Sequence, residues 1–161
     1  MKKKIFYTAA VLAAAMLLTA WYAGISPDSL AENKDGIKWY SYDDGIKELK
    51  KSSRKGFLHF YTDWCGYCRK MEDETFSDSE VISTVNSEFI PIKIDAEDQP
   101  GIAKEFDARQ FPSNFFVDRE NDPIGSQPGF IPPDMMVNLL DYVATDDYKT
   151  MEFEEFMDER R

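Results

Sequence analysis

Residues 56–71 read Gly-Phe-Leu-His-Phe-Tyr-Thr-Asp-Trp-Cys-Gly-Tyr-Cys-Arg-Lys-Met, and this stretch holds both cysteines of the chain. Phe57 to Tyr61 is a short apolar and aromatic run, which has the length of a buried strand and is too short for a helix. From Cys65 onward the spacing becomes helical, because Cys65, Cys68 and Glu72 fall at i, i+3 and i+7 on one side of a helix. The pattern predicts a strand, a short turn and a helix that begins at Cys65.

The two cysteines are the candidate catalytic residues. A thiolate at a helix N-terminus faces unpaired backbone N–H groups and the positive end of the helix dipole, which favours ionisation. Cysteines of Cys-X-X-Cys motifs in this position have a pKa of roughly 3.5 to 7.5, against ~8.5 for a free thiol. Cys68 is within disulfide reach of Cys65 and lies further inside the helix, where we expect it to be less exposed. We therefore expect Cys65 to attack and Cys68 to resolve the product.

Two other interpretations of the cysteine pair stay open. A zinc ion needs four ligands, and this chain offers only one further sulfur or imidazole donor, His59. A purely structural disulfide would close too small a loop to stabilise the fold much. Redox chemistry is the interpretation that the pattern favours, and we expect no metal.

The N-terminal residues 1–26 predict a membrane signal. Three lysines precede 21 residues without a charge, and Trp21 and Tyr22 stand near the far end of this run. About 20 apolar residues span a bilayer, and aromatic residues suit its interface, so we expect an uncleaved anchor. A cleaved signal peptide is the alternative, although residues 18–20 make a mediocre cleavage site. In both cases the domain is exported, either anchored in the inner membrane and facing the periplasm or secreted into the periplasm.

The exported part is strongly acidic. The whole chain of 161 residues carries a formal charge of −11, and residues 1–26 contain three lysines and no acids, so the remainder carries −14. Such a surface is a poor partner for nucleic acid. A solvated face is the simplest meaning of this charge, and charge alone does not name a substrate.

The length fits one domain with appendages. Residues 27–36 are polar and indicate a linker. The domain is expected over residues 37–145. Residues 146–161 form an acidic tail in which Phe153 and Phe156 would lie on one face of an amphipathic helix.

Strands and helices are expected to alternate along the domain. Ser77, followed by Glu80 three residues later, has the pattern of a capping box at a helix start. Apolar runs predict the strands, and apolar residues at helical spacing predict the helices. The expected strands are 37–40, 57–61, 89–94, 115–118 and a partner around 124, and the expected helices are 43–52, 65–75, the one capped by Ser77, 100–106 and 132–144.

These motifs carry a family resemblance. Trp-Cys-Gly-Tyr-Cys at 64–68, after an apolar strand, resembles the active site of the thioredoxin superfamily, and residues 111–117 resemble its cis-proline loop and following strand. Residues 63–78 and 89–95 are similar to the C-terminal domain of DsbD-type thiol-disulfide interchange proteins and to small exported thioredoxin-like proteins. The resemblance implies an α/β thioredoxin fold, with a central mixed sheet, helices on both faces and the active site at the C-terminal ends of the parallel strands.

The resemblance also implies a function. Domains of this type exchange disulfides with protein thiols, and those of the DsbD type are reductants, so we expect a protein-disulfide reductase that is fed by a membrane thiol electron donor and needs no soluble cofactor. A disulfide oxidase or isomerase is the alternative within this class. Outside it, a copper-delivery protein is possible because thiol pairs bind Cu(I). The only histidine, however, lies inside a predicted strand.

Further site residues follow from the same resemblance. Trp64 would cover the edge of the site, and Gly66 and Tyr67 separate the two cysteines. Pro112 would follow a cis peptide bond. The backbone of Phe111 would then pair with an extended segment of the substrate.

Two titratable residues have roles that stay open. Glu72 matches a glutamate near the active site of DsbD-type domains, and it could equally be a solvated helix acid. His59 stands six residues before Cys65, where thioredoxins usually carry a buried aspartate. Burial would keep its imidazole neutral, so it could accept the proton of the resolving thiol, or it could only pack in the core.

Overall fold

The computed structural model describes residues 36–161. The predicted membrane signal at residues 1–26, and nearly all of the predicted linker at 27–36, lie outside the described residues. Within residues 36–161, no helix combines the length and the apolar character that crossing a membrane requires. The described residues comprise the predicted domain and its C-terminal tail.

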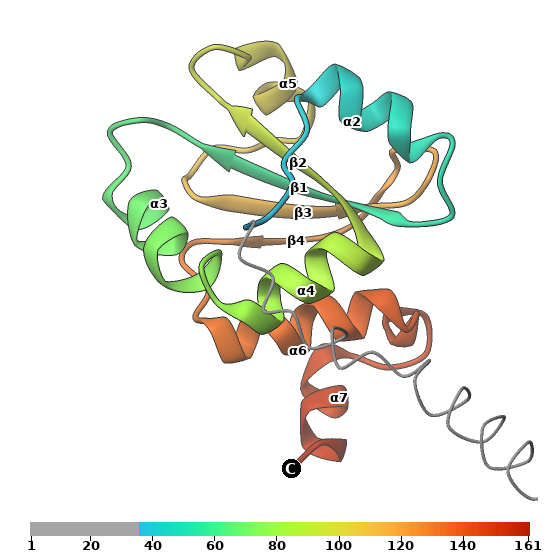
Figure 1. Cartoon of the computed structure of the whole chain (residues 1–161). Helices are drawn as coiled ribbons and strands as arrows, with labels where there is room; N and C mark the ends of the chain where they lie inside the picture. Colours follow the sequence, from blue (N-terminus) through green and yellow to red (C-terminus); the bar gives the residue numbers. More distant parts are fainter. Residues whose placement is uncertain (1–35) are drawn as a thin grey trace, which may run out of the picture. The chain divides into compact units, whose positions relative to one another are not determined.

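Strands and helices alternate along the described chain (Figure 1). The strands are β1 (Lys55–Tyr61), β2 (Phe89–Asp95), β3 (Ser113–Val117) and β4 (Pro123–Pro128). The helices are α2 (Tyr42–Leu49), α3 (Gly66–Lys70), α4 (Ser79–Glu88), α5 (Pro100–Glu105), α6 (Pro133–Ala144) and α7 (Phe153–Glu159). A π-helical turn, Met71–Thr75, continues α3, and a 3-10 turn, Asp147–Lys149, follows α6.

The four strands form one mixed sheet in the order β2-β1-β3-β4. The central strand β1 pairs in parallel with β2 and antiparallel with β3, and β3 pairs antiparallel with β4. Tyr61 and Asp95 are opposite each other where β1 and β2 end. The predicted mixed sheet is confirmed, and the turn that leads to Cys65 leaves it at the C-terminal ends of its parallel strands.

The predicted edge strand at residues 37–40 is wrong. Only Tyr40 makes a β-bridge, an isolated parallel one to Ile92. The Trp39 N–H donates to the Ile37 carbonyl at 3.1 Å, and the Lys38 N–H donates to the side chain of Asn86 at 2.9 Å. Because these donors are used locally or by a side chain, the segment cannot extend the ladder.

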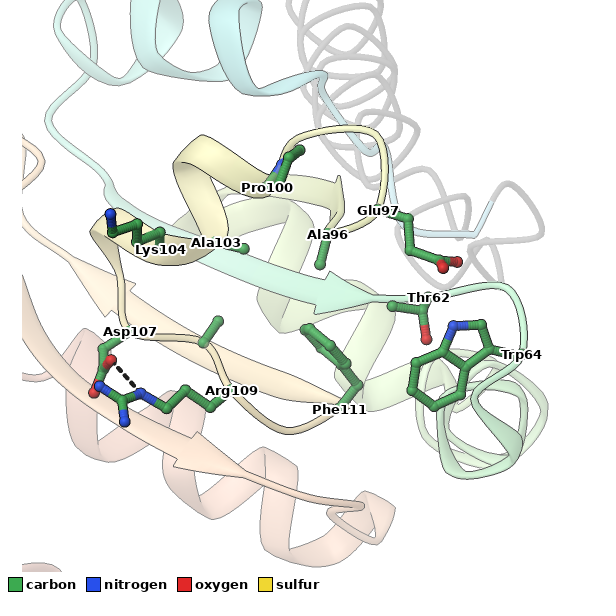
Figure 2. Close-up of a pocket in the computed structure, with 11 residues that line it drawn as sticks. Thr62, Trp64, Ala96, Glu97, Pro100, Ala103, Lys104, Asp107, Arg109 and Phe111 are labelled. Carbon is green, nitrogen blue, oxygen red and sulfur yellow. Dashed lines mark hydrogen bonds and ion pairs between the residues drawn. The ribbon is translucent and has the colours of Figure 1, made fainter.

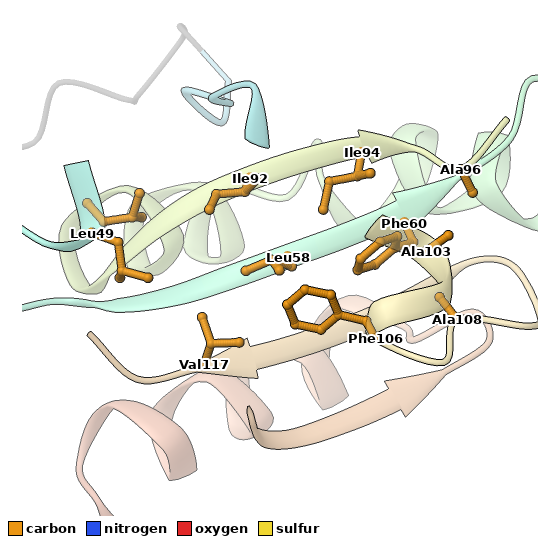
Figure 3. Packing of buried hydrophobic residues seen from close by; sticks show 11 residues of the cluster. Leu49, Leu58, Phe60, Ile92, Ile94, Ala96, Ala103, Phe106, Ala108 and Val117 are labelled. Atoms are coloured by element: carbon orange, nitrogen blue, oxygen red, sulfur yellow. The ribbon is translucent and has the colours of Figure 1, made fainter. Parts of the chain in front are cut away.

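Side chains alternate across the sheet and build two cores. On β1, Leu58 and Phe60 pack with residues of α2 and α5, and Figure 3 shows this first core. Phe57, on the opposite face, packs with residues of α4 and α6. Burying an aliphatic or phenyl side chain stabilises a fold by roughly 1.5–3 kcal/mol, so β1 is held from both sides. It therefore forms a fixed base for the active-site turn.

Helix α4 begins one residue later than predicted. Asp78, rather than Ser77, is its cap, and Asp78 Oδ1 accepts hydrogen bonds from the N–H groups of Glu80 and Val81 at 2.9 and 3.1 Å. The Ser77 hydroxyl donates to the Asp73 carbonyl at 2.7 Å and so closes the preceding helix. Aspartate caps as well as serine, and its charge also interacts favourably with the helix dipole.

The C-terminal tail packs on α6. The ring of Tyr142 contacts the rings of Phe153 and Phe156 at centroid distances of 5.3 and 5.2 Å, and its hydroxyl donates to the Met151 carbonyl at 2.6 Å. Phe156 is buried. The acidic tail thus contains an amphipathic helix whose aromatic face lies against the domain.

Candidate active site

Cys65 and Cys68 are joined by a disulfide at the start of α3. Cys65 is the N-cap residue, and its Sγ accepts a hydrogen bond from the Cys68 N–H at 3.1 Å. Their Cα atoms lie 5.2 Å apart. Because the first N–H groups of a helix have no partners within it, this position favours negative charge on Cys65 Sγ when the disulfide is opened.

Exposure scarcely separates the two cysteines. Cys65 is 5% exposed and Cys68 is 3% exposed, so Cys68 is the less exposed residue, as expected, but only by a small margin. Both residues are therefore buried in the oxidised protein. What distinguishes the residues is their place in the helix, with Cys65 at the cap and Cys68 inside the first turn.

Two aromatic side chains flank the disulfide on the surface. Trp64 is 67% exposed and Tyr67 is 65% exposed. Between the cysteines, the space beside Gly66 is open, because a Cβ there would meet only the end of the Arg69 side chain at 4.0 Å. Two large aromatic side chains exposed beside one disulfide make this part of the surface a candidate contact surface.

The loop before β3 lies beside the active-site turn. Phe111 and Pro112 are joined by a cis peptide bond, as the resemblance implies. The Pro112 carbonyl accepts a hydrogen bond from the N–H of Gly129 at 2.7 Å, and Gly129 adopts a φ of +88°, which favours glycine. The ring of Phe111 meets that of Trp64 edge to face, with centroids 6.4 Å apart. The structure thus brings the predicted loop and the predicted tryptophan together.

A cavity of about 380 Å³ opens beside Trp64 and Phe111 (Figure 2). Exposed charged side chains lie at its rim, where Arg109 Nε and Asp107 Oδ1 form an ion pair at 2.6 Å. Ala103 and two further alanines leave the space open, so the cavity has room for a large apolar side chain. It is lined by Thr62, Trp64, Ala96, Glu97, Pro100, Ala103, Lys104, Asp107, Ala108, Arg109 and Phe111.

A second cavity, of about 240 Å³, lies beside Cys68. Glu72 Oε1 and Lys93 Nζ form an ion pair in it at 2.5 Å. Glu72 is thus brought to the same cavity as the second cysteine, as its helical spacing of four residues from Cys68 indicates. The lining residues are Tyr61, Thr62, Asp63, Cys68, Arg69, Glu72 and Lys93.

Lys93 and Arg69 belong to the site and were not predicted. The Lys93 ammonium lies 4.9 Å from the centroid of the Tyr61 ring, and Arg69 Nη1 donates to the Asp63 carbonyl at 2.8 Å. A signal for Lys93 is present in the sequence, because it is the one charged residue within the apolar run 89–94. Arg69 has no comparable signal, since a basic residue on a helix is usually only solvated.

Tyr61 stays uncharged at neutral pH. Burial raises its pKa, and so does the negative charge of Asp95, Asp63 and more distant acids. Its hydroxyl therefore keeps its proton. The charged side chains in the cavity beside Cys68 are then two carboxylates and two cations.

His59 is buried in the core on the other side of β1 from Leu58 and Phe60. Its Nδ1 lies 2.9 Å from Asn114 Oδ1, and Asn114 Nδ2 donates to a backbone carbonyl, so Nδ1 carries the proton and donates. The ring of Phe76 packs edge-on at 4.8 Å. This setting holds the imidazole in one orientation.

The imidazole of His59 is neutral at pH 7, as expected. Burial lowers its pKa to about 4. The hydrogen bond to Asn114 acts to raise the pKa, and the positive charge of Lys93 acts to lower it. His59 lines neither of the two cavities, whereas Glu72 lines the one that contains Cys68. The position six residues before Cys65 thus holds a buried imidazole, and the two carboxylates of the cavity beside Cys68 come from Asp63 and Glu72.

The fold and the site define a class. A disulfide across Cys-Gly-Tyr-Cys follows the central strand of a mixed sheet and stands at a helix start, and the adjacent Trp64 contacts Phe111 of the cis-proline loop, which is the architecture of thioredoxin-type redox proteins. A family model described as "Thioredoxin-like domain" matches residues 42–144. The chain belongs to this thioredoxin-like family, and the predicted resemblance is confirmed.

Three similar proteins illustrate the relationship. The thioredoxin-like protein CITRX from chloroplasts of Arabidopsis thaliana is 33% identical over 60% of this chain and 52% of its own length. The thiol:disulfide interchange protein DsbD of Ralstonia nicotianae is 27% identical over 62% of this chain and 17% of its own length. The solved C-terminal domain of DsbD from Neisseria meningitidis is 26% identical, with a TM-score of 0.54, over 62% of this chain and 90% of that domain. This chain spans between about a tenth and about half of the length of the curated relatives that it matches.

Proposed function

We propose that this protein is an exported thiol-disulfide oxidoreductase that reduces disulfide bonds of protein partners through Cys65 and Cys68. The observation that carries the proposal is the disulfide at the start of α3, flanked by the exposed side chains of Trp64 and Tyr67. A disulfide with only a structural role would gain little from closing so short a loop. A structural disulfide also does not require exposed aromatic side chains beside it.

Reduction proceeds through two exchange steps. The Cys65 thiolate attacks one sulfur of the partner's disulfide, so that a mixed disulfide forms and the partner's other sulfur leaves as a thiolate. Cys68, once deprotonated, attacks Cys65 Sγ, which restores the Cys65–Cys68 disulfide and releases the second thiolate of the partner. Two electrons pass to the partner, whose thiolates take their protons from solvent.

The proton of Cys68 leaves through the cavity that it shares with Glu72 and Lys93. The Glu72 carboxylate is placed to accept it, and the Lys93 ammonium beside it favours the negatively charged sulfur. His59 stays a second candidate for the base, because it is neutral at pH 7 and its buried Nε2 has no hydrogen-bond partner among the described residues.

The partner binds along the loop at Phe111. An extended segment of the partner pairs with the backbone of Phe111, and a bulky apolar side chain of that segment enters the cavity beside Trp64. The three alanines of this cavity supply the space. The preferred partner is therefore a protein whose disulfide lies next to a large apolar residue.

The direction and the location rest on relatives and on the N-terminal sequence. The DsbD domain, at 26% identity, supports a reductant, and the basic and apolar residues 1–26 support export with a membrane anchor. The electron donor is then a thiol protein of the same membrane. An oxidase or isomerase would use the same cysteines, and its reduction potential would lie closer to the ~−120 mV of DsbA than to the ~−270 mV of thioredoxin.

Reduction of insulin disulfides by the reduced protein tests the proposal. The parent protein should reduce insulin, Cys65→Ser should be inactive, and Cys68→Ser should accumulate a mixed disulfide without releasing product. The reduction potential is measured on the same preparation by equilibration with glutathione. Failure to reduce insulin, together with a potential near ~−120 mV, would replace the reductase by an oxidase.

A further inference from the structure

We infer that a groove along β4 is a docking site for an extended segment of a partner protein that carries bulky apolar residues and a basic residue. This edge groove consists of two adjoining cavities, of about 360 and 240 Å³, which are lined by residues of β4, α6 and the start of α7. The two cavities share Gln127, Leu139 and Phe153, and neither shares a residue with the cavities beside Trp64 and Cys68. The edge groove is therefore separate from the redox site.

A glycine leaves the larger cavity of the edge groove open. Gly125 on β4 pairs with Phe116 on β3, so side chains at the two positions lie on the same face of the sheet, the one that packs with α6. Both residues line the larger cavity. The ring of Phe116 is buried there, whereas a Cβ at Gly125 would meet no heavy atom within 4 Å. Glycine inside a strand often marks a place where a ligand or another backbone approaches, and the space at Gly125 accepts an apolar side chain of a partner.

The smaller cavity is lined mostly by apolar side chains. One of them, Met135, is 38% exposed. Within residues 36–161, the other large apolar side chains that are exposed are Trp64 and Tyr67, and both flank the disulfide. Met135 therefore belongs to an exposed apolar surface that the redox site does not include. An apolar side chain of a partner would bind here favourably, because its binding removes apolar area from water.

The free edge of β4 offers backbone hydrogen bonds to the same partner. In the described part of the chain, β4 is the last strand of the sheet and pairs only with β3 (Figure 1). The Gly129 N–H donates to the Pro112 carbonyl at 2.7 Å. Because hydrogen-bonded pairs alternate along an antiparallel ladder, Gly125 and Gln127 direct their backbone groups toward β3, and Ser126 directs its own outward.

An extended segment can therefore pair with Ser126, as when a strand is added to the edge of a sheet. Ser126 is exposed, so its backbone groups are accessible. Because β4 begins and ends with a proline, this pairing is short. The side chains that enter the two cavities then supply most of the affinity.

Charge selects a basic partner. Of the described residues, only Glu152 and Glu154 bring charged side chains to the two cavities. Both are exposed, and neither forms an ion pair with a lysine or arginine of residues 36–161. Two unpaired carboxylates at one groove attract a basic segment and repel an acidic one. A second copy of this chain is disfavoured for the same reason, because it would bring the same two carboxylates to the contact.

Two synthetic peptides test the inference on the full chain in detergent micelles. The first peptide, Arg-Thr-Leu-Thr-Leu-Thr-Arg with blocked ends, places both leucines on one face of an extended chain and an arginine at either end. The second peptide has glutamate in place of both arginines. Isothermal titration calorimetry should show that the arginine peptide binds at least ~10-fold more tightly than the glutamate peptide. Equal affinities, or no binding of either peptide at millimolar concentration, would overturn the inference.

A filled cavity gives an independent measurement with a matched control. Gly125→Leu places a side chain in the larger cavity, and Gly101→Leu adds the same side chain at a glycine of α5 whose Cβ would also meet no heavy atom within 4 Å. We expect the arginine peptide to bind ~10-fold more weakly to Gly125→Leu and with unchanged affinity to Gly101→Leu. Equal affinities for both variants would contradict the docking site.

Two further variants separate the backbone from the charge. Ser126→Pro removes the outward N–H and keeps the ladder to β3, because proline is tolerated on the solvent side of an edge strand, and it should weaken binding of the arginine peptide ~3-fold. Replacing Glu152 and Glu154 together by glutamine should bring the affinities of the two peptides to within ~3-fold of each other. An unchanged preference for the arginine peptide in this double variant would refute the role of the two carboxylates.

These measurements do not depend on the proposed redox function, because none of them uses the disulfide. Thermal unfolding shows which variants fold, and the two peptides on the parent protein and on the glutamine double variant decide the inference even if Gly125→Leu and Ser126→Pro do not fold. Sedimentation of the parent protein tests the other occupant. Self-association that is lost in Gly125→Leu would assign the edge groove to a second copy of the chain and refute the partner segment.

Discussion

Acidification from pH 7 to pH 5 should weaken the fold through His59. The side chain is fully buried, its Nδ1 is hydrogen bonded to Asn114, and its Nε2 has no partner among the described residues. Burial lowers its pKa from 6.5 to about 4. The unfolded chain takes up a proton near pH 6.5 and the native chain only near pH 4. The unfolded state therefore binds more protons between these values, and stability falls as the pH falls through this window.

The size of the effect follows from these two pKa values. At pH 7 the imidazole is mostly neutral in both states. At pH 5 it is almost fully protonated in the unfolded chain and still neutral in the native one, so the free energy of unfolding decreases by ~2 kcal/mol between the two pH values. A domain has only about 5–15 kcal/mol of stability, so the change is readily measured.

Urea unfolding at pH 7, 6 and 5 measures the effect, with His59→Gln as the matched variant. Glutamine does not titrate and keeps an N–H donor for Asn114. The carboxylates titrate alike in both proteins, so the difference between the two pH profiles isolates the imidazole. The parent should lose ~2 kcal/mol more than the variant between pH 7 and pH 5. Parallel profiles would refute the reasoning from burial.

Four further predictions concern the site and the N-terminus. In the reduced protein, iodoacetamide at pH 7 should label Cys65 at least ~10-fold faster than Cys68, and the reverse order would exchange their roles. Ala103→Leu should lower kcat/KM ~10-fold for disulfide peptides with a neighbouring bulky apolar residue and leave peptides with a neighbouring glycine unaffected; a uniform loss would exclude a specificity cavity. Glu72→Gln should slow release of the mixed disulfide ~10 to 100-fold without slowing its formation, and the same effect in His59→Ala alone would assign the base to the imidazole. The full chain should stay with membranes after a salt wash, whereas a mature N-terminus near residue 21 would identify a cleaved signal peptide.

Most elements of the domain could be predicted because their signals are local. The apolar run at 57–61 and the helical spacing after Cys65 place the strand and the helix of the active site with little dependence on the rest of the chain. The misplaced elements depend on distant groups. Residues 37–40 are not a strand because Asn86, 48 residues after Lys38, takes one of their backbone donors. Two possible caps stand side by side at Ser77 and Asp78, and the choice depends on where the preceding π-helical turn ends.

The sequence by itself determined the chemistry of this protein. Two cysteines three residues apart at a helix start are a property of spacing, and spacing needs no partner from elsewhere in the chain. Which side chains accompany them was decided only by the tertiary structure. Glu72 and Lys93, 21 residues apart, meet beside Cys68 because β2 pairs in parallel with β1 and presents Lys93 next to the helix. His59 is paired with Lys93 in the register and lies on the same face of the sheet, but it is fully buried and does not line the cavity, because neighbouring strands and helices cover it in the folded chain.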